Sequence, residues 1–476
     1  MSVLSLLLVV CCLVPLAVAQ DWPRFRGPNG SGISESAAEF PIHFGEDKNL
    51  LWKIRISQGH SSPVIAGERL YYTAADDKYL LTGCVDTNTG RHIWIRSIER
   101  SQRLSHHPNN GSATPTPTTD GQQVYAFFPE FGLVCYRSDG KERWRLPLGP
   151  FRNSHGMASS PILWERVVLL VCDQDVGSFL VAVETSTGFI RWKCSRQEIV
   201  GAAYSTPVLV RRDDNIPELI VSGGFQLAAY SISTGTKEWW VGGFPMQPKS
   251  SPIAGKASGR EIIFTSYQSS GEGGSDFPSF GSILESVDLN QDRKISADES
   301  AAHSFLRSVF LQIDINGDGY VSEQEYQFLL DSARAPSEVV AIVPRSNSSK
   351  NEARTVWRYR KAVPNVPTPL LYRGVLYLLK EGGILTGLDA PSGNVLKQGR
   401  LSNVLDPYFA SPVAGHGKVF VVSQQGNIVV LRAGRDWEVI ATNSLGEECF
   451  ATPALSNGRV FVRTNRSLFC FGYRRK

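Results

Sequence analysis

Short apolar runs separated by turn-forming residues recur along most of the chain. The clearest copy extends from Ser160 to Trp192: it starts with Ser-Pro, contains the apolar segments VVLLVC and FLVAVE, and turns at Thr187-Gly188 before the tryptophan. Runs of this length that are rich in β-branched residues predict strands, and the 3.6-residue periodicity of a helix is absent from them. The repeated unit is therefore predicted to consist of β-strands.

Eight Ser-Pro or Thr-Pro dipeptides mark where copies of the unit start. Most intervals between their prolines are 41 to 52 residues long, whereas one interval, which begins at Pro252, is 117 residues long. A period of roughly 40 to 50 residues with short strands is typical of a β-propeller with one four-stranded blade per repeat. We therefore expect an all-β, eight-bladed propeller with an insertion in its fifth blade. The eight prolines are Pro63, Pro115, Pro161, Pro207, Pro252, Pro369, Pro412 and Pro453.

The two ends of the repeat region have complementary deficits. Leu50 to Ile56 places Trp52 where other repeats have a tryptophan, but no blade precedes it. After Pro453 the chain lacks the residues for a fourth strand. We therefore expect Leu50 to Ile56 to pair beside Leu468 to Phe471, which closes the ring and removes the free sheet edges.

A glycine stands four residues before a tryptophan in four successive repeats. Glycine suits the tight turn before the last strand, because it adopts a positive φ at little cost. We expect the large rings to pack between neighbouring blades and not to line a cofactor site. The pairs are Gly90 with Trp94, Gly140 with Trp144, Gly188 with Trp192 and Gly235 with Trp239.

This recurrence resembles the repeats of the quinoprotein-type propeller family, which are also called pyrroloquinoline-quinone-like repeats. That family contains eight-bladed alcohol dehydrogenases as well as a non-enzymatic lipoprotein scaffold of outer-membrane assembly. The resemblance covers residues 21 to 476 except for the insertion. It implies the propeller fold and leaves the chemistry open.

Composition divides the chain into five segments. The first contains the apolar run Val3 to Val14, followed by Ala17-Val18-Ala19, which is typical of a cleaved signal peptide and predicts export to the periplasm or the extracellular space. The apolar run is too short to span a membrane. We expect a signal peptide over residues 1–19, an extended segment over 20–48, blades over 49–268, the insertion over 269–337 and further blades over 338–476.

The insertion contains two segments with the spacing of an EF-hand calcium loop, DLNQDRKISADE and DINGDGYVSEQE. Such a loop surrounds Ca²⁺ with oxygen ligands at positions 1, 3, 5, 7, 9 and 12, of which position 7 supplies its main-chain carbonyl. The expected ligands are Asp288, Asn290, Asp292, Lys294 (carbonyl), Ser296 and Glu299 in the first loop, and Asp314, Asn316, Asp318, Tyr320 (carbonyl), Ser322 and Glu325 in the second.

The two loops differ at position 6, where the chain bends sharply. Gly319 adopts such a bend easily, whereas Arg293 takes the same place in the first loop at a conformational cost. We therefore expect two Ca²⁺ sites, of which the second binds more tightly, and a short β-bridge between Ile295 and Val321. The alternative is a degenerate pair that binds no metal.

Charge also separates the insertion from the propeller. Asp276 to Asp331 contains 11 acidic and 3 basic residues, which is a net charge of −8. Because the whole chain has a net charge of +4, the residues outside this segment have a net charge of +12. This balance favours contact between the acidic insertion and the basic propeller. No nucleic-acid-binding motif is present in the sequence, so a nucleic-acid partner is not expected.

The residues just before the repeat starts are expected to line the mouth of the central funnel, because the chain crosses there from one blade to the next. They are polar or aromatic, unlike the strands. A ligand site in the funnel is one interpretation, and ordinary solvated loops are the other. In order they are His60, Asn110, His155, Tyr204, Lys249, Asn365, Tyr408 and Phe450.

Two functions fit these features. The first is a secreted or periplasmic, calcium-binding propeller that binds a protein partner or a small ligand without catalysis, as a scaffold or an adhesion protein. The second is a dehydrogenase that holds pyrroloquinoline quinone in the funnel. The family's dehydrogenases carry a vicinal cysteine pair, and the only such pair here, Cys11-Cys12, lies in the signal peptide, which favours the first function. The sequence assigns no catalytic residue.

The insertion is also expected to replace the turn between the second and third strands of its blade. In an up-and-down blade that turn leaves on the same face as the crossings between blades. The EF-hand pair is therefore predicted on the funnel face, at its rim or over its mouth.

Overall fold

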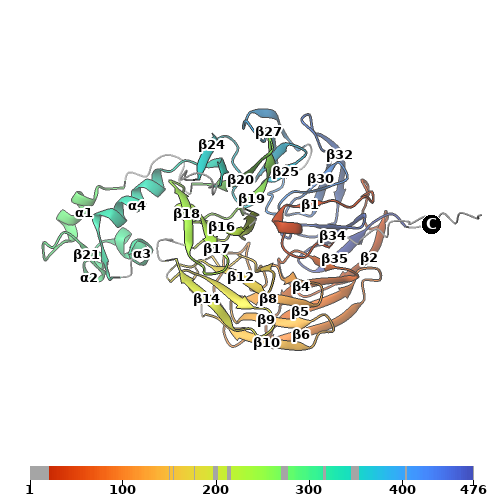
Figure 1. The fold of residues 1–476 in the computed structure, drawn as a ribbon, viewed down its shortest axis with the longest axis horizontal. Coiled ribbons are helices and arrows are strands. Elements are labelled where there is room, and N and C mark those ends of the chain that lie inside the picture. The colour runs from red at the N-terminus through yellow and green to blue at the C-terminus, as the bar shows by residue number, and fades with distance from the viewer. Residues whose placement is uncertain are drawn as a thin grey trace, which may run out of the picture.

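The computed structural model describes residues 21–149, 151–153, 155–175, 177–196, 202–211, 216–269, 277–314, 318–344, 353–401 and 405–474. Within these residues, eight β-sheets surround a central channel as the blades of a propeller (Figure 1). Seven of these described sheets have four antiparallel strands, and the remaining one has a fifth, parallel strand added to its four antiparallel strands. The predicted eight-bladed β-propeller is confirmed. The expected signal peptide lies outside the described residues.

Each blade begins with a strand at the channel and ends with a strand at the outer rim. First strands of neighbouring blades, such as β3 and β7, contact one another around the axis. Blades 1 to 4 are β3 (Val64–Ala66), β4 (Arg69–Ala75), β5 (Tyr79–Asp86) and β6 (His92–Glu99); β7 (Thr118–Thr119), β8 (Gln123–Phe128), β9 (Gly132–Arg137) and β10 (Glu142–Pro147); β11 (Ile162–Trp164), β12 (Val167–Cys172), β13 (Phe179–Glu184) and β14 (Ile190–Ser195); and β15 (Val208–Arg211), β16 (Pro217–Gly223), β17 (Gln226–Ser231) and β18 (Lys237–Gly242).

The remaining blades complete the ring. Blades 5 to 8 are β19 (Ile253–Ala257), β20 (Arg260–Tyr267), β23 (Glu338–Val343) and β24 (Arg354–Tyr359); β25 (Leu370–Tyr372), β26 (Val375–Lys380), β27 (Ile384–Asp389) and β28 (Val395–Arg400); β29 (Val413–Gly415), β30 (Lys418–Val422), β31 (Asn427–Arg432) and β32 (Glu438–Ser444); and β33 (Ala454–Ser456), β34 (Arg459–Arg463), β35 (Ser467–Phe471) and β2 (Leu50–Arg55).

The strand β2 supplies the outer strand of blade 8. It pairs antiparallel with β35, so that Leu50 lies opposite Phe471 and Arg55 opposite Ser467. Three strands of this blade therefore come from the C-terminal part of the chain and one from the N-terminal part. This is the pairing that the two incomplete ends of the repeat region predict.

Neighbouring blades are joined by the tryptophans of their outer strands. The ring of Trp144 in blade 2 covers Gly188 in blade 3, and a Cβ on that glycine would lie 2.7 Å from the ring. The indole N–H donates to the main-chain oxygen of Thr185 at 2.8 Å. The same contact recurs between Trp52 and Gly90, Trp94 and Gly140, Trp192 and Gly235, and Trp357 and Gly393.

The segment before β2 crosses the channel. Main-chain bonds join Trp22 to Ile65 in blade 1, and β1 (Ile33–Ser34) pairs in parallel with β29 in blade 7. Between them lies the short helix η1 (Pro28–Gly30), and Asn29 exchanges two hydrogen bonds, of 2.7 and 3.0 Å, with the main chain of Leu209 in blade 4. The segment therefore holds blades together from across the ring.

The insertion stands between β20 and β23 and is helical. Its elements are α1 (Phe280–Val287), β21 (Ile295–Ser296), α2 (Ala297–Ala301), α3 (Ser304–Ile313), β22 (Tyr320–Val321) and α4 (Glu323–Arg334). The predicted bridge between Ile295 and Val321 is confirmed. The helices form their own apolar core, separate from the cores between the blades.

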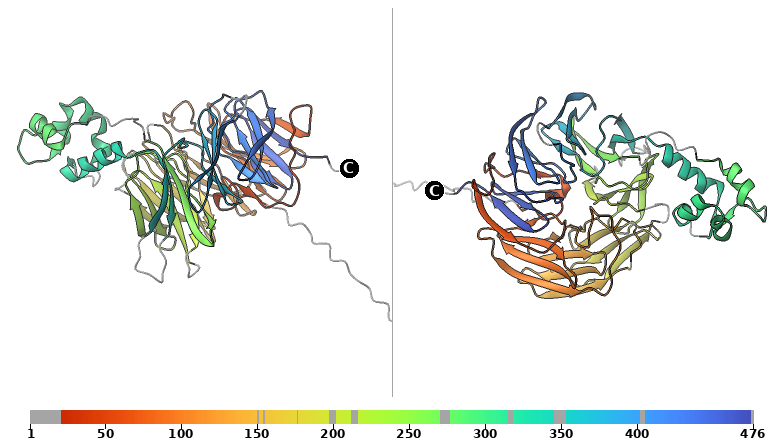
Figure 2. Two further views of the ribbon diagram at one scale, coloured as in Figure 1. Left: turned by 90° about the horizontal axis from the view of Figure 1, so that it is seen from above. Right: turned by 180° about the vertical axis from the view of Figure 1, so that it is seen from behind.

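The insertion projects from the side of the ring and rests on blade 4 (Figure 2). Phe328 of α4 contacts Phe225 in the turn between β16 and β17, with ring centroids 5.9 Å apart. Met246, in the crossing from blade 4 to blade 5, packs against the helical core. Both contacts lie on the face where the chain crosses between blades, so the EF-hand pair stands at the rim of the funnel face and not over its mouth.

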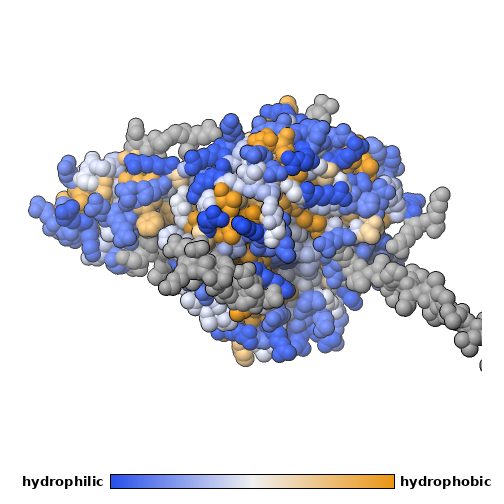
Figure 3. Space-filling view, turned by 45° about the horizontal axis from the view of Figure 1, so that its top comes forward, coloured by the Kyte–Doolittle hydropathy of each residue, from blue (hydrophilic) through white to orange (hydrophobic). Residues whose placement is uncertain are grey.

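The surface of the molecule is mostly hydrophilic on the face shown in Figure 3, where apolar residues form separate patches. Most apolar residues are buried within and between the blades. No disulfide is found among the cysteines of the described part of the chain, and all except the half-buried Cys194 are buried, as small core residues are. Among the described residues, no helix is long and apolar enough to cross a membrane.

Candidate funnel site and EF-hand loops

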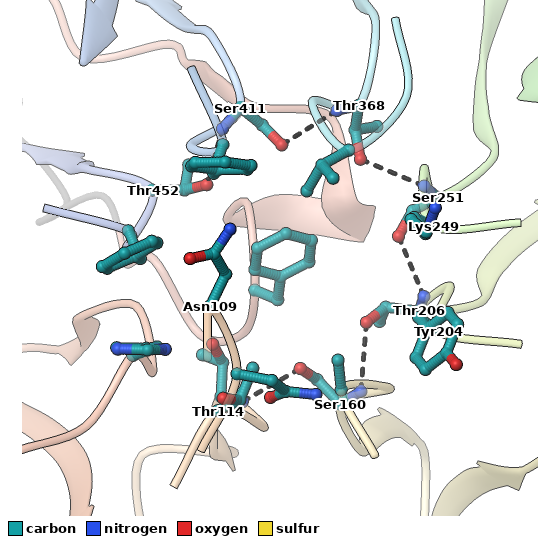
Figure 4. A pocket seen from close by; sticks show the side chains of 18 of the residues that line it. Asn109, Thr114, Ser160, Tyr204, Thr206, Lys249, Ser251, Thr368, Ser411 and Thr452 are labelled. Atoms are coloured by element: carbon teal, nitrogen blue, oxygen red, sulfur yellow. Dashed lines mark hydrogen bonds between the residues drawn. The ribbon is translucent and has the colours of Figure 1, made fainter. Parts of the chain in front are cut away.

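A closed ring of hydrogen bonds surrounds the channel where each blade begins. In every blade a serine or threonine stands directly before the proline that starts the first strand, and its main-chain N–H donates to the hydroxyl of the equivalent residue in the next blade (Figure 4). The eight distances lie between 2.9 and 3.1 Å. We call these residues the hydroxyl ring: Ser62, Thr116, Ser160, Thr206, Ser251, Thr368, Ser411 and Thr452.

The sequence places these hydroxyls for a local reason. A proline restricts the residue before it to an extended backbone, so each hydroxyl-bearing residue enters the channel in the same conformation. Because proline has no N–H, the main-chain donor to the next blade is the N–H of the residue before it. The recurrent Ser-Pro and Thr-Pro pairs therefore encode the contacts between blades as well as the starts of the strands.

The hydroxyl ring lines a cavity of about 370 Å³ that opens on the funnel face. This volume lies within the range of roughly 300 to 1,000 Å³ that is usual for small-molecule sites. Residues three positions before the strand-starting prolines form the wall on all sides. They are His60, Thr114, Ala158, Tyr204, Lys249, Val366, Phe409 and Phe450.

The structure corrects the sequence prediction at two points. Tyr408 does not line the funnel: its side chain is fully buried in the core between blades 6 and 7, and its neighbour Phe409 faces the cavity. His155 and Asn110 line the cavity as predicted, and Ala158 and Thr114, which are closer to the strand starts, line it as well.

The second correction concerns the start of blade 2. The sequence TPTP offers Pro115 and Pro117, and the hydroxyl ring passes through Thr116, so the blade starts at Pro117 and not at Pro115. Two consecutive Thr-Pro pairs are equivalent as local signals. Only the bonds to blades 1 and 3 distinguish them, and those bonds connect residues far apart in the sequence.

Aromatic rings cover one side of the cavity. Phe450 stacks on His60 with ring centroids 4.5 Å apart and on Phe409 with centroids 5.7 Å apart. Burial, together with the charge of the nearby Arg463, lowers the pKa of His60 to about 4. His60 is therefore neutral at physiological pH, and this side of the cavity is a flat, uncharged surface.

The opposite side carries a lysine. Lys249 lies beside Asn365, with 3.2 Å between the Lys249 Nζ and the Asn365 Oδ1, and partial burial lowers the pKa of the lysine. Tyr204 stands next to His155, whose ring it meets edge to face, and the Tyr204 hydroxyl has no hydrogen-bond partner among the described residues. His155 in turn stacks on His107 at the rim. This side is thus polar.

The floor of the cavity comes from the segment that crosses the channel. Phe25 lies at the bottom, and its neighbours Arg24 and Arg26 are both buried. Arg24 donates to the carbonyl of Pro207 at 2.6 Å, and Arg26 donates to those of Thr368 and Pro369, each at 2.9 Å. Burial lowers the pKa of both guanidinium groups, which nevertheless remain charged at neutral pH.

The first EF-hand loop has the internal bonds of a folded calcium loop. Asp288 Oδ2 accepts the main-chain N–H of Arg293 at 3.0 Å, and Asp288 Oδ1 is buried without a partner among the described residues. Glu299 closes the loop by accepting the N–H of Leu289 and of Ser296. A buried, unpaired carboxylate oxygen at position 1 fits a cation ligand.

The second loop has the same arrangement where it is described. Asp314 Oδ2 accepts the N–H of Gly319 at 3.0 Å, Asp318 Oδ1 accepts that of Tyr320 at 2.9 Å, and Glu325 accepts from the main chain and the hydroxyl of Ser322. The predicted ligand Asn316 lies outside the described residues.

The bend at position 6 differs between the loops as the sequence suggests. Arg293 has a φ of 64° and Gly319 a φ of 86°, so both occupy the left-handed region. Only the arginine pays a steric cost there. The remaining predicted ligands of the first loop are exposed or half-buried at its turn: Asn290, Asp292, Lys294 and Ser296.

Sequence reasoning missed the floor of the cavity. The residues Trp22 to Gly30 carry no strand signal, and their bonds reach blades 1, 4 and 6, which no local pattern reveals. The one signal in the sequence that could have indicated this role is the unusual content of arginine and aromatic residues in the segment. The hydroxyl ring was visible as Ser-Pro and Thr-Pro pairs, but only as a marker of repeats.

The fold and this cavity define an eight-bladed propeller with a polar, partly aromatic central funnel. A protein-family model described as outer membrane protein assembly factor BamB matches residues 43–179 and 345–472, which is more than half of the chain. The chain therefore belongs to this family. A model of the EF hand matches residues 306–330, around the second loop. None of the curated proteins compared matches the chain.

Solved structures of similar fold include a BamB protein and dehydrogenases. BamB from Moraxella catarrhalis has a TM-score of 0.55 at 9% identity, over 90% of this chain and 98% of that one. A europium-containing methanol dehydrogenase has a TM-score of 0.61 at 9% identity, over 95% and 98%. The quinohemoprotein alcohol dehydrogenase from Comamonas testosteroni has a TM-score of 0.57 at 12% identity, over 96% of this chain and 81% of that one. At such identities the similarity shows the fold alone.

Proposed function

We propose that the protein is an exported, calcium-binding propeller that acts without catalysis as a binding or scaffold protein and holds a ligand or a protein partner at its funnel face. One observation favours this binding function over that of a dehydrogenase. Among the described residues that line the funnel cavity, none is an aspartate or a glutamate. The lining offers hydroxyls, amides, aromatic rings, three histidines and one lysine.

The alternative is a quinoprotein dehydrogenase with Ca²⁺ beside the quinone, and this lining does not fit it. Ca²⁺ is a hard cation that prefers carboxylate and carbonyl oxygens. A lysine on the wall and two buried arginines beneath the floor repel a cation at this place. The vicinal cysteines that the family's dehydrogenases carry are also absent from the described part of the chain.

The calcium sites belong to the insertion. We propose that Asp288, Asn290, Asp292, the Lys294 carbonyl, Ser296 and Glu299 hold one ion, and that Asp314, Asn316, Asp318, the Tyr320 carbonyl, Ser322 and Glu325 hold a second, tighter one. The internal bonds of both loops support this assignment, and the EF-hand match supports it for the second loop. Ca²⁺ would offset the mutual repulsion of the loop carboxylates and order the helices.

Export is part of the same proposal. The support for it is the signal-like sequence of residues 1–19 and the description of the family as an assembly factor of the outer membrane. A scaffold in that compartment would use the rim of the funnel, where His107 and Asn109 are exposed.

Site-specific cross-linking tests the binding function. A photoreactive side chain at Asn109, at the funnel mouth, is expected to give discrete products in the exported fraction of the source cells. The matched control is the same side chain at Ser392, an exposed turn between the third and fourth strands on the opposite face. Equal products from both positions would contradict a funnel-face partner.

A second experiment tests the absence of catalysis. The purified protein is mixed with pyrroloquinoline quinone and Ca²⁺, and dye-linked oxidation of alcohols is recorded. We expect no turnover. A tight complex with turnover would overturn the proposal in favour of the dehydrogenase.

A further inference from the structure

A second cavity lies at the opposite end of the channel from the funnel. The first strand of each blade runs from the hydroxyl ring toward the other face of the propeller, and the last residues of three of these strands line this cavity. They are Thr119 of β7, Trp164 of β11 and Arg211 of β15. The cavity has a volume of about 320 Å³ and, among the described residues, shares no lining residue with the funnel cavity. It is therefore a separate pocket, bounded by blades 2, 3 and 4.

The segment that crosses the channel separates the two cavities. Phe25 faces the funnel, whereas its neighbours Pro23 and Arg24 line the second cavity. Asn29 lines the second cavity as well, and its side chain is held there by the two hydrogen bonds to the main chain of Leu209. Adjacent residues of this segment therefore serve opposite ends of the channel.

The two buried arginines of the segment differ in their hydrogen bonds. The guanidinium group of Arg26 donates to four main-chain carbonyls, those of Gly30, Ser31, Thr368 and Pro369. The guanidinium group of Arg24, which is 5% exposed, donates to one carbonyl among the described residues, that of Pro207. An arginine side chain has five N–H donors. Arg26 is therefore bonded as a structural residue is, whereas most donors of Arg24 are unused.

Arg24 also lacks a counter-charge. Its Nε is enclosed without a partner among the described residues, and it forms no ion pair with any of them. Burial is the cause that lowers its pKa to about 9, and no nearby carboxylate opposes that effect within the described chain. A buried charge without a partner is costly, because its lost hydration is not replaced. An anion in the cavity would supply the missing partner.

A second arginine stands at the mouth of this cavity. Arg211 is exposed, and its side chain forms no hydrogen bond or ion pair among the described residues. The turns after β7 and β11 carry Asp120 and Glu165, which are exposed and do not line the cavity. Asp120 faces its own turn, where it accepts the main-chain N–H groups of Gln122 and Gln123 at 2.9 and 2.7 Å. The described lining therefore carries two positive charges and no negative one.

The rest of the wall is largely apolar. Trp164 is half-buried, as are Leu163 and Leu209, and all three line the cavity. The aromatic surface of a tryptophan packs well against a flat apolar group. The volume lies at the lower end of the range of roughly 300 to 1,000 Å³ that is usual for small-molecule sites. The cavity therefore suits one anionic group with a small apolar substituent.

We propose that this cavity binds a phosphate monoester, with the phosphate at Arg24 and Arg211 and the apolar ester group against Trp164. The forked guanidinium groups match the spacing of phosphate oxygens. A phosphate monoester carries a charge of about −1.5 to −2 at pH 7, so it balances two arginines better than a carboxylate does. This site goes beyond the proposed funnel function and does not depend on it.

Calorimetric titration with matched probes tests the proposal. Phenyl phosphate has both parts of the ligand, phenyl sulfate keeps the shape with a single charge, and inorganic phosphate lacks the ring. We expect phenyl phosphate to bind at least about tenfold more tightly than either of the others, since each lacks one contribution. Equal affinity of phenyl phosphate and either comparison probe, or no binding of phenyl phosphate, would overturn the proposal.

Paired arginine variants locate the site. Arg211→Gln is expected to weaken phenyl phosphate roughly tenfold. Arg260→Gln is the matched control, because Arg260 is exposed at the start of β20, after the first-to-second-strand turn of blade 5, and does not line the cavity. Equal weakening by both variants would refute a specific site. Arg24→Lys keeps the charge, loses the fork and should also weaken binding; if circular dichroism shows that it is unfolded, Arg211→Gln decides.

A funnel variant excludes binding at the other end of the channel. Lys249 lines the funnel and not the second cavity, so Lys249→Gln should leave the affinity for phenyl phosphate unchanged. A tenfold loss in Lys249→Gln, with none in Arg211→Gln, would place the anion in the funnel and overturn the proposal. Cross-linking at Asn109 reports on the funnel partner independently of either result.

Two sources supply such a phosphate: a free monoester, or the headgroup of a lipid such as phosphatidic acid. Sedimentation with phosphatidylcholine vesicles that contain or lack phosphatidic acid distinguishes them. Sedimentation that requires phosphatidic acid, is displaced by phenyl phosphate and is lost in Arg211→Gln assigns the site to a lipid. Binding of phenyl phosphate without sedimentation assigns it to a free monoester.

Discussion

The main-chain N–H of Thr452 donates to the hydroxyl of Ser62 at 3.1 Å, across 390 residues of sequence. This bond completes the hydroxyl ring and lies in the same joint between blades 8 and 1 that β2 helps to form. Ser62→Ala removes its acceptor and leaves a buried N–H without a partner. We expect a loss of about 1–3 kcal/mol in the free energy of unfolding, measured by urea denaturation.

A control shows whether the position matters. Ser186 is exposed in the turn between β13 and β14, and Ser186→Ala is expected to change stability by less than about 0.5 kcal/mol. A Ser62→Ala protein as stable as the control would show that the ring contributes nothing to closure.

The tryptophan contacts predict different costs for two similar glycines. Gly188 and Gly259 have φ values of 79° and 75°, but a Cβ on Gly188 meets Trp144 at 2.7 Å, whereas a Cβ on Gly259 meets nothing within 4 Å. Gly188→Ala should therefore lower the midpoint of unfolding much more than Gly259→Ala does. Gly259→Ala loses only the backbone contribution, about 1 kcal/mol of the free energy of unfolding. Similar midpoints would mean that the blades adjust to the added methyl group.

The EF-hand loops are expected to bind Ca²⁺ with unequal affinity. In calorimetry, Glu325→Gln should abolish the tighter site and Glu299→Gln the weaker one, since each removes the carboxylate at position 12. Arg293→Gly relieves the bend and should tighten the weaker site about fivefold. Arg293→Gln is the control for the loss of charge, because it keeps the strained bend; an equal gain from both variants would reject the strain argument.

Calcium is expected to act on blade 4 through Phe328. Chelation should loosen α4 and increase amide exchange in the crossing that contains Met246 and Lys249, as measured by hydrogen exchange with mass spectrometry. Phe328→Ala separates the helix from Phe225 and should make exchange in the crossing insensitive to chelation. If exchange there never responds to Ca²⁺, the insertion is independent of the funnel.

The histidine of the aromatic wall gives a pH dependence. The pKa of His60 is about 4, below the ordinary value of 6.5, so the unfolded chain binds more protons than the folded one between these values. The contribution of His60 to stability is therefore complete above about pH 6.5 and is lost as the pH falls toward 4. NMR titration of the His60 ring should show a midpoint near 4, and His60→Phe should reduce the acid sensitivity of unfolding; a midpoint near 6.5 would refute burial.

The sequence predicts the architecture because each blade repeats a local pattern. The sequence alone shows the successive strands, the recurrent pairs such as Gly188 and Trp192, and the two incomplete ends. These features determine the number of blades and the way the ring closes. The EF-hand loops are equally legible, since twelve consecutive residues carry the ligands. These features need no knowledge of distant contacts.

The funnel is harder to predict because its members come from different blades. Tyr408 and Phe409 are adjacent and both aromatic, and only the exact crossing path decides which one faces the cavity. Pro115 and Pro117 present the same ambiguity. The floor is the extreme case, since the bonds of Arg26 to Thr368 and Pro369 span more than 340 residues.

The segment that crosses the channel also imposes an order on assembly. Trp22 to Ser34 is bound to blades 1, 4, 6 and 7, so its binding places do not exist until the chain has been made at least as far as Val413. This N-terminal segment is synthesised before the blades that bind it, so it must dock late in folding. A propeller that lacks one of these blades would leave this segment unbound. Its arginines, which are buried in the complete fold, would then be exposed to proteases and chaperones that bind incompletely folded chains.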